Sequence, residues 1–408
     1  DSTTADATAH YVVVREDGRE LFYALTPVVD VLSSGEIDAA AMAGMGASTC
    51  KVPPLMICNP LEGSDDEFDP ADYVGRGIRL VANDGGGGYG PGNFGFLDSG
   101  VGNGANTVRQ LLGTIDIPGD CQPGSDVTTQ PGEMVSVLDA LNTRFDIYAN
   151  GLNNPCGANN ADCPPSANAR KDVVMRAPNG NGNVNCGYVP NANANSVGWR
   201  VPLQPYLPSS TTPYDAGTYP AGLSPMGYPR DICHAIASPN CAEDRIGDGS
   251  WDRYAYFRSN SVNYPTIPTA SDMLAWFGSA SPTRYQVYRY EMDHPGTRLL
   301  TQNAGPNMTA YGQPAPFCGG TGITPGGSTV DRRRLSVAVI NCDEEGVSGR
   351  TTDIEVKHWI DVFLTEPSLR RERTEASDVY VEVIGEASSS GDGTQGQVVQ
   401  RNVPYLVR

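Results

Sequence analysis

The sequence predicts a mainly β fold with a few short helices, a β-rich α+β protein that is stapled by disulfides and has long loops rich in asparagine, glycine and proline. Three observations predict it. Glycine (47) and proline (32) are too abundant among 408 residues for a helical protein and suit short strands joined by turns. Several segments combine β-branched and aromatic residues in strand-like runs. Ten cysteines provide cross-links for the long loops.

The order of these features divides the chain into three parts. Residues 1–48 hold a strand and a small-residue segment that we expect to pack on the β core. Residues 49–282 form a loop-rich, disulfide-stapled region with short helices. Residues 283–408 form the C-terminal β core.

The first two parts mix strands with helices. Strands are expected at 10–15, 77–84 and 143–148, and the alanine-rich run 37–48 fits either a helix or an extended segment. Helical spacing and end signals predict helices at 107–113 (capped by Asn106 and closed by Gly113), 131–141 and 271–277 (ended by Gly278).

The last part is the most strand-like. Strands are expected at 284–292, 333–342, 356–366 and 378–386. In the last of these Val379, Val381 and Val383 share one face, because side chains alternate along a strand.

The charge balance excludes two classes of partner. The formal net charge is −19, from 28 basic and 47 acidic residues. Such a chain repels nucleic acid and anionic lipid. The sequence holds no secretory signal and no apolar run of the ~18 residues that cross a membrane, so we expect no membrane span here and a leader removed from a secreted precursor.

The cysteines favour disulfides over metal or redox chemistry, because none stands in a C-x-x-C pair. Disulfides indicate an oxidising, extracellular or cell-surface location. Sequence does not define the pairing. Proximity favours Cys50–Cys58, Cys156–Cys163, Cys233–Cys241 and Cys318–Cys342, which leaves Cys121–Cys186. A bridge between Cys50 and Cys58 presents Leu55, Met56 and Ile57 as a stiff apolar knob, for the protein's own core or for a neighbouring subunit.

Three motifs suggest nucleotide binding or catalysis and are better explained otherwise. Gly85, Gly87 and Gly90 match G-x-G-x-x-G, but Pro91 follows where a phosphate-binding helix would begin, so a loop between strands is the better interpretation. Asp231, Cys233 and His234 (DICH) offer a nucleophile beside a base, and Asp293 with His294 offers a second acid–imidazole pair. Neither has the sequence context of a known nucleophile, and pairing of Cys233 would remove its thiolate.

Two further groups are candidate binding sites. Asp65, Asp66, Glu67, Asp69 and Asp72 offer carboxylate oxygens for calcium, as does the run 158–162, although neither matches a calcium-loop motif and a solvated turn is the default. Trp251, Tyr254, Tyr256 and Trp276 would suit a groove for glycan or protein, or the packing of a β core. No other cofactor is expected.

Two stretches resemble a known family. They are YALTPVVDVLSSGEIDAAAMAGMGASTCKVPPLMICNPLE (23–62) and RRRLSVAVINC…VKHWIDVFLTEP…DVYVEVIGE (332–386). Together they resemble the C-terminal, extracytoplasmic region of TadG-like proteins of the tight-adherence (Flp) pilus assembly system. Shorter segments at 91–98, 141–148, 228–233 and 284–291 fit the same pattern. The resemblance implies a pilus-related surface role and supplies no active-site residues.

The leading functional hypothesis is therefore a secreted structural protein rather than an enzyme. It would be a pilus-associated component or a self-assembling fibre subunit, because polar tails joined to strand-like runs at both ends can add a strand to a neighbour's sheet. The alternatives are a surface adhesin or glycan- or protein-binding module and, with least support, a hydrolase.

Overall fold

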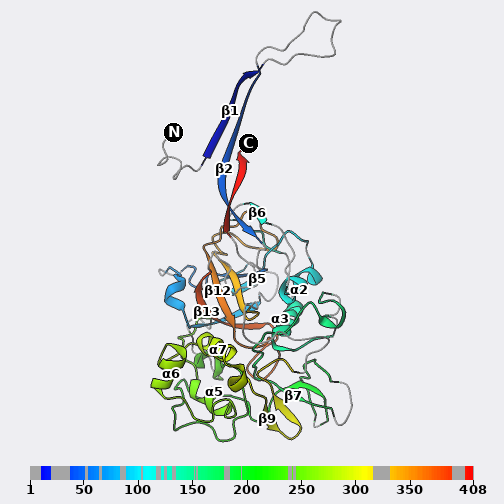
Figure 1. Ribbon diagram of the computed structural model, residues 1–408, viewed down its shortest axis with the longest axis vertical. Coiled ribbons are helices and arrows are strands. Elements are labelled where there is room, and N and C mark those ends of the chain that lie inside the picture. The colour runs from blue at the N-terminus through cyan, green and yellow to red at the C-terminus, as the bar shows by residue number, and fades with distance from the viewer. Residues whose placement is uncertain are drawn as a thin grey trace, which may run out of the picture.

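The computed structural model describes residues 11–19, 37–50, 54–63, 67–82, 89–102, 104–115, 121–123, 126–130, 135–150, 152, 155–178, 184–193, 195–237, 241, 245–315, 331–387 and 400–407. A body built around a closed β-barrel carries a narrow ribbon of strands that projects from one end (Figure 1). The β-rich fold with a few short helices is as the sequence predicted.

The centre of the body is a closed barrel of six strands in the order β11-β12-β13-β4-β5-β3. Neighbours are antiparallel except that β3 runs parallel to β11 and β5 runs parallel to β4. The strands are β3 (Leu55–Cys58), β4 (Gly77–Ala82), β5 (Asn93–Phe96), β11 (Arg334–Ile340), β12 (His358–Leu364) and β13 (Asp378–Glu386). The strands predicted at 77–84, 333–342, 356–366 and 378–386 are confirmed, and the barrel closes only with strands from the first hundred residues.

Alternation along the strands fills the barrel. Val379, Val381 and Val383 of β13 belong to one buried apolar cluster, as the shared face predicted. Burial of each such side chain contributes about 1.5–3 kcal/mol. Between them, Tyr380 contacts His234 and Glu382 pairs with Arg284, so the other face of β13 meets the surrounding layers.

A disulfide between Cys58 and Cys342 fastens the parallel pair of strands, with a Cα–Cα distance of 5.3 Å. Cys58 ends β3 and lies opposite Ile340 of β11, so the ends of the two strands meet. The predicted pairs Cys50–Cys58 and Cys318–Cys342 are therefore wrong. Proximity in sequence predicted the wrong partners. Cys58 and Cys342 are 284 residues apart, and the parallel pairing of β3 with β11 brings them together.

The residues of the expected apolar knob belong to the chain's own core. Leu55, Met56 and Ile57 form most of β3 and are at most 4 % exposed. The first and third lie in the cluster that fills the barrel, and Met56 packs in the cluster outside it. The alternative, a knob for a neighbouring subunit, is excluded.

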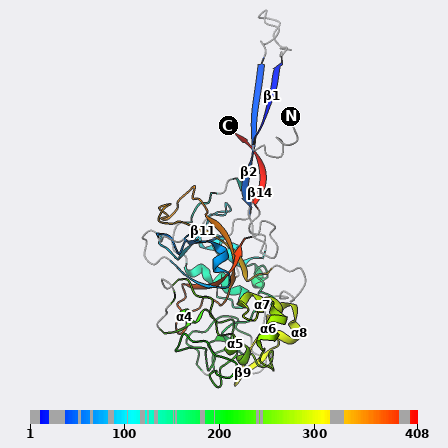
Figure 2. The ribbon, with the colours of Figure 1, turned by 90° about the vertical axis from the view of Figure 1, so that its left-hand side faces the viewer.

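A helical layer covers one side of the barrel (Figure 2). It consists of α4 (Ile232–Ala235), α5 (Arg253–Ser259), α6 (Ala270–Phe277), α7 (Arg284–Asp293) and α8 (Pro295–Arg298). Its aromatic core includes Phe363, which points outward from β12. The predicted helix at 271–277 is confirmed, with Gly278 in the left-handed conformation (φ 77°) after its last turn.

Helix α7 corrects the strand predicted at 284–292. Its tyrosines and valine resemble a strand, but a capping box precedes them: the Thr283 side chain accepts from the Gln286 N–H, and the Gln286 side chain accepts from the Thr283 N–H. The buried residues then follow helical spacing: Arg284, Val287, Tyr288, Glu291 and Met292.

Further helices and 3₁₀ turns lie against the same barrel core. They are α2 (Ala105–Gly113), α3 (Asp139–Asn142) and the 3₁₀ turns η1 (Pro70–Tyr73), η2 (Val135–Leu138), η3 (Thr143–Phe145) and η4 (Ala158–Asn160). Gly104, not Asn106, stands at the N-cap of α2. The strand predicted at 143–148 is wrong, because η3 is followed by Asp146 in the left-handed conformation (φ 62°), which ends any regular run. The described part of the predicted helix 131–141 is a 3₁₀ turn followed by one α-helical turn.

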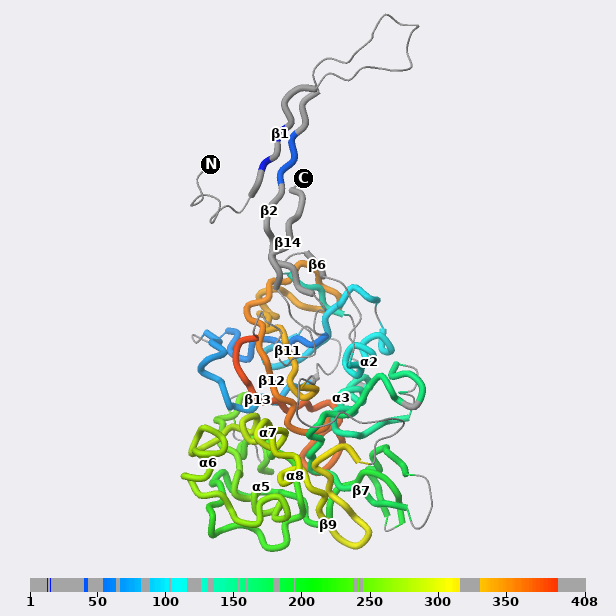
Figure 3. The backbone as a smooth tube through the Cα atoms, viewed as in Figure 1, coloured from blue at the N-terminus to red at the C-terminus, as the bar shows by residue number. Residues whose placement is uncertain are grey.

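A second sheet lies at the end of the body opposite the ribbon (Figure 3). Its order is β8-β7-β10-β9, from β7 (Val174–Arg176), β8 (Gly198–Arg200), β9 (Gln302–Gly305) and β10 (Met308–Ala310). Its strands β7 and β8 fix part of the irregular region 149–222, which the sequence predicted to need tethering.

The projecting ribbon, called the stalk below, consists of β1 (Tyr11–Arg19), β2 (Ile37–Cys50) and β14 (Gln400–Val407), and β6 (Cys121–Pro123) pairs with the base of β2. The strand predicted at 10–15 is confirmed, and the alanine-rich run is extended rather than helical. The stalk stands away from the barrel (Figure 1), so β1 and its partner residues 37–44 of β2 lie off the β core on which residues 1–48 were expected to pack. Residues 1–10 and 20–36 lie outside the described chain.

Candidate functional site

The stalk presents strand edges that the described residues leave open. β2 lies in the middle, with β1 on one side and β14 on the other. β1 pairs along 37–44 of β2, whereas β14 pairs along 42–49. The outer edges of β1 and β14, and one edge of β2 at residues 37–41, have no partner strand within the described part of the chain. An open edge is a template for another strand.

The stalk also exposes apolar side chains to solvent. Val13 and Met42 face each other across β1 and β2 and are 51 % and 37 % exposed. Ala40 on the same face and Ala41 on the opposite face are exposed as well. A two-stranded ribbon with solvent on both faces is only marginally stable in water. The stalk therefore has both the open backbone and the apolar surface of an association site.

The cysteines whose side chains the structure describes all form disulfides. Cys156–Cys163 and Cys233–Cys241 form the predicted disulfides, Cys186 is also disulfide-bonded, and the described part of the chain contains no free cysteine. The strand register places the backbone of Cys50 opposite Cys121. Cys318 lies outside the described residues.

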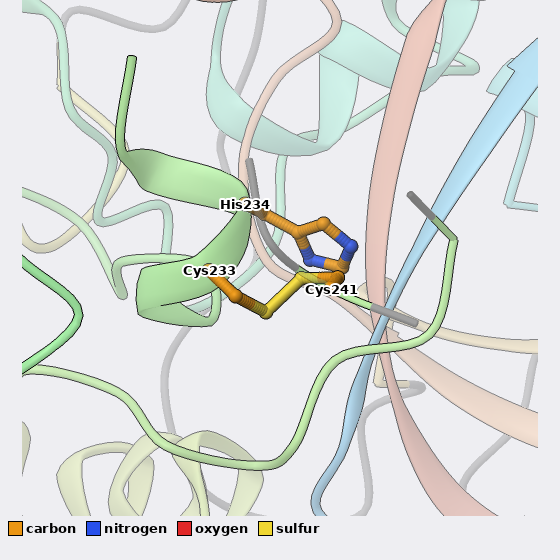
Figure 4. A group of neighbouring side chains, drawn as sticks. All are labelled: Cys233, His234 and Cys241. Carbon is orange, nitrogen blue, oxygen red and sulfur yellow. A yellow bond between two sulfur atoms is a disulfide. The ribbon is translucent and has the colours of Figure 1, made fainter. Parts of the chain in front are cut away.

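The DICH motif forms a compact cluster that has no free thiolate. Figure 4 shows the Cys233–Cys241 disulfide beside the His234 ring. His234 lies edge-to-face with Tyr380, at 5.8 Å between ring centroids. Burial lowers the pKa of His234 to about 4, which keeps the ring neutral at physiological pH. The motif therefore offers no nucleophile in this oxidised state.

The second acid–imidazole pair lies at the end of α7. His294 is exposed, stacks on Tyr290 at 4.2 Å and places Nδ1 at 2.8 Å from the Tyr290 carbonyl oxygen. These contacts hold the His294 side chain against the end of α7.

The glycine motif lies between β4 and β5, and Gly90 and Pro91 lead into a strand. Gly85 and Gly87 lie outside the described residues.

Only part of the acidic loop lies within the described residues. Asp65 and Asp66 lie outside it. Asp69 caps η1 by accepting from the Ala71 N–H at 2.9 Å, whereas Glu67 and Asp72 are exposed. Among the described residues, metal-compatible groupings occur only around Cys233 and not in this loop or at 158–162. Calcium binding stays a prediction.

Of the two alternatives for the aromatic residues, packing is what the structure shows for Trp251 and Tyr256, which build the helical layer and not the β core. Ligand binding by Tyr254 and Trp276 stays a prediction. Trp251 and Tyr256 are 1 % and 0 % exposed, whereas Tyr254 and Trp276 are half-buried against the same cluster. The cluster surrounds Glu291.

Glu291 accepts hydrogen bonds from three buried tyrosine hydroxyls. The distances are 2.5 Å from Tyr228, 2.5 Å from Tyr256 and 2.7 Å from Tyr264. Arg170 adds an ion pair at 3.3 Å. A carboxylate so enclosed is structural, because its acceptor sites are already used.

Two pockets of the body are not proposed as ligand-binding sites. The first, beside Arg230 and Glu366, has a volume of about 70 Å³, well below the ~300 Å³ of small ligand sites. The second is a groove of about 530 Å³. There the Asn142 side chain bonds to the backbone of Ser368, and the Tyr188 hydroxyl donates to the Arg370 carbonyl. These polar groups are therefore engaged within the protein.

Comparisons with protein-family models, with curated proteins and with solved structures found no match. No helix in the described residues is long and apolar enough to cross a membrane. The disulfides fit an extracellular protein.

Proposed function

We propose that this chain is a structural subunit of an extracellular assembly and that its stalk joins it to the stalk of a second copy. The single observation that carries the proposal is the stalk itself: a strand ribbon that stands off the body with open edges. The barrel and the helical layer serve as a disulfide-stapled body that each copy contributes.

A stalk without a partner leaves strand edges and apolar side chains exposed to water. Each unpaired strand edge exposes N–H and C=O groups that a neighbouring strand can satisfy, and such strand addition is a common mode of association. The exposed Val13 and Met42 add apolar surface at the same place. A second copy fits best, because it supplies strands of the same length and composition.

The resemblance of residues 23–62 and 332–386 to TadG-like proteins supports a pilus-related assembly. The first of these stretches contains β2 and β3, and the second contains β11, β12 and β13, so the resemblance includes a stalk strand as well as four barrel strands. The proposal assigns no catalytic step to the chain.

The test is the mass of the purified chain in solution as its concentration rises. It should be run near 0.15 M salt, because the net charge of −19 repels copies at low ionic strength. We expect the mass to rise with concentration, and Val13→Lys with Met42→Lys to suppress the rise. Leu274→Lys is the matched control, because Leu274 is 57 % exposed on the body. A wild-type chain that stays monomeric at high concentration contradicts the proposal, as does equal association of the stalk variant.

A further inference from the structure

The DICH cluster holds the atoms of a metal site in its oxidised form. The Sγ atoms of Cys233 and Cys241 and a ring nitrogen of His234 all lie within 4.8 Å of one another. A second grouping shares Cys233: its Sγ lies within 4.8 Å of carboxylate oxygens of Asp231 and Asp248, which also lie that close to each other. Two sulfurs, one imidazole and one carboxylate make up a ligand set that zinc accepts.

His234 provides the second, independent observation. Its side chain is buried, at 4 % residue exposure, and neither ring nitrogen has a hydrogen-bond partner among the described residues. A buried polar group without a partner costs about 1–3 kcal/mol and calls for a physical reason. The disulfide gives none, whereas a metal ion would use one nitrogen as a ligand.

The two carboxylates differ in availability. Asp231 is held by the buried guanidinium of Arg284 and by the backbone N–H groups of Gly77 and Gly249. Asp248 is exposed, and within the described chain its Oδ1 accepts a hydrogen bond only from the Ser250 N–H, at 2.9 Å. Asp248 is therefore the less engaged of the two carboxylates. It lies near Cys233 but is not grouped with His234 or Cys241, so it would have to move to become the fourth ligand.

We propose that reduction of the Cys233–Cys241 disulfide creates a zinc site formed by Cys233, His234, Cys241 and Asp248. A dithiol reductant supplies two electrons and two protons, the S–S bond breaks, and the reductant is oxidised to its own disulfide. Zinc then displaces the two cysteine protons and binds both thiolates. Reoxidation by a disulfide releases the metal and restores the observed bond, so metal binding depends on the redox state.

The Cys233–Cys241 disulfide is the most accessible of the three described disulfides. Cys241 is half-exposed, whereas Cys58 and Cys342 are 0 % and 1 % exposed and the other pair is fully buried. Thiol–disulfide exchange requires the attacking thiolate to reach a sulfur. A mild dithiol is therefore expected to open this bond first. The inference does not depend on the proposed assembly.

The test measures zinc retained after gel filtration by the full chain, before and after mild reduction. Differential alkylation with peptide mass spectrometry establishes that Cys233 and Cys241 are the thiols released. We expect no bound zinc in the oxidised chain and one equivalent in the reduced chain. Replacement of zinc by Co²⁺ should give the visible absorption of a tetrahedral thiolate site.

Variants separate the site from adventitious thiol binding. Cys233→Ser with Cys241→Ser should abolish binding, and His234→Asn should weaken it by roughly tenfold or more. Cys156→Ser with Cys163→Ser is the matched control and should still bind one equivalent. The proposal is overturned if the chain with both thiols confirmed free retains no zinc, or if His234→Asn binds zinc as tightly as the wild type.

Discussion

Lys171 is a buried amine whose removal should change how stability depends on pH. The residue is 3 % exposed, donates to the Ala169 carbonyl at 3.1 Å and places Nζ 3.6 Å from the centroid of the Trp199 ring. Burial lowers the pKa of Lys171 to about 7, and the charge of Asp146 offsets part of that effect. The perturbation is Lys171→Met, which keeps the apolar stem and removes the amine.

The magnitude follows from the difference between the folded and unfolded pKa values. Between the folded pKa of about 7 and the ordinary 10.5, the unfolded chain binds a proton at Lys171 that the folded chain does not. The free energy of unfolding of the wild type therefore rises with pH in this window, by up to ~1.4 kcal/mol per pH unit and roughly 5 kcal/mol in all. Below pH 7 both states bind the proton, and the full cost of burying the charge is present.

The assay is urea unfolding of the oxidised proteins at several pH values from 6.5 to 9.5. Lys171→Met should lack the extra slope, so its advantage over the wild type should be largest at the acidic end and shrink as pH rises. Lys357→Met is the control. The hydrogen bond to Glu355 raises the pKa of Lys357, so this amine stays charged in both states over most of the range, and the variant should keep the wild-type slope. Parallel curves for the wild type and Lys171→Met would refute the assignment of a lowered pKa to Lys171.

Three further predictions test the fold. Replacing Cys58 and Cys342 by serine should lower the free energy of unfolding by about 5 kcal/mol on the loop-closure model, because the bridge spans 284 residues; a loss below ~1 kcal/mol in urea unfolding would contradict it. Arg284→Met leaves two buried carboxylates without their cation and should cost about 3–5 kcal/mol, measured in the same way; a neutral result would show that the pairs are dispensable. Thr283→Ala removes the cap of α7 and should cost ~1 kcal/mol, whereas Thr283→Ser should restore most of it; equal stability of the two variants would argue against the capping box.

Much of the barrel could be predicted from local pattern, because its strands alternate. The valines of β13 identify its inner face from sequence alone, and the structure places them in the barrel core. Helix α7 could not be recognised by composition, since its tyrosines and valine are typical of strands. The signal that could have identified it was the T-x-x-Q spacing of Thr283 and Gln286.

Other features depend on tertiary structure and have no local signal. The Cys58–Cys342 bridge follows from parallel pairing of strands at opposite ends of the chain. Arg333 sits in a basic run that resembles a charged surface, yet it is fully buried. Its guanidinium donates to the carbonyls of Leu364, Thr365 and Arg170 and lies over the Phe363 ring at 4.6 Å. Those partners come from segments that sequence analysis could not place together.

The candidate sites likewise divide into features that local sequence predicts and features that depend on tertiary structure. Proximity correctly paired Cys233 with Cys241, because eight residues form a short loop. The aromatic residues around Trp251 were assigned to a groove or to a core, and burial decides for the core. The stalk was anticipated only as strand-like tails, since no sequence pattern states how far a ribbon stands from the body that carries it.

Hydrogen exchange of the full chain at low and high protein concentration tests the central claim, association through the stalk, most directly. If copies pair along the stalk, amides of β1, β2 and β14 should gain protection as concentration rises, while amides of the barrel strands stay unchanged. Val13→Lys with Met42→Lys should abolish that gain. A rise in mass with unchanged exchange in the stalk would place the contact elsewhere and contradict the account.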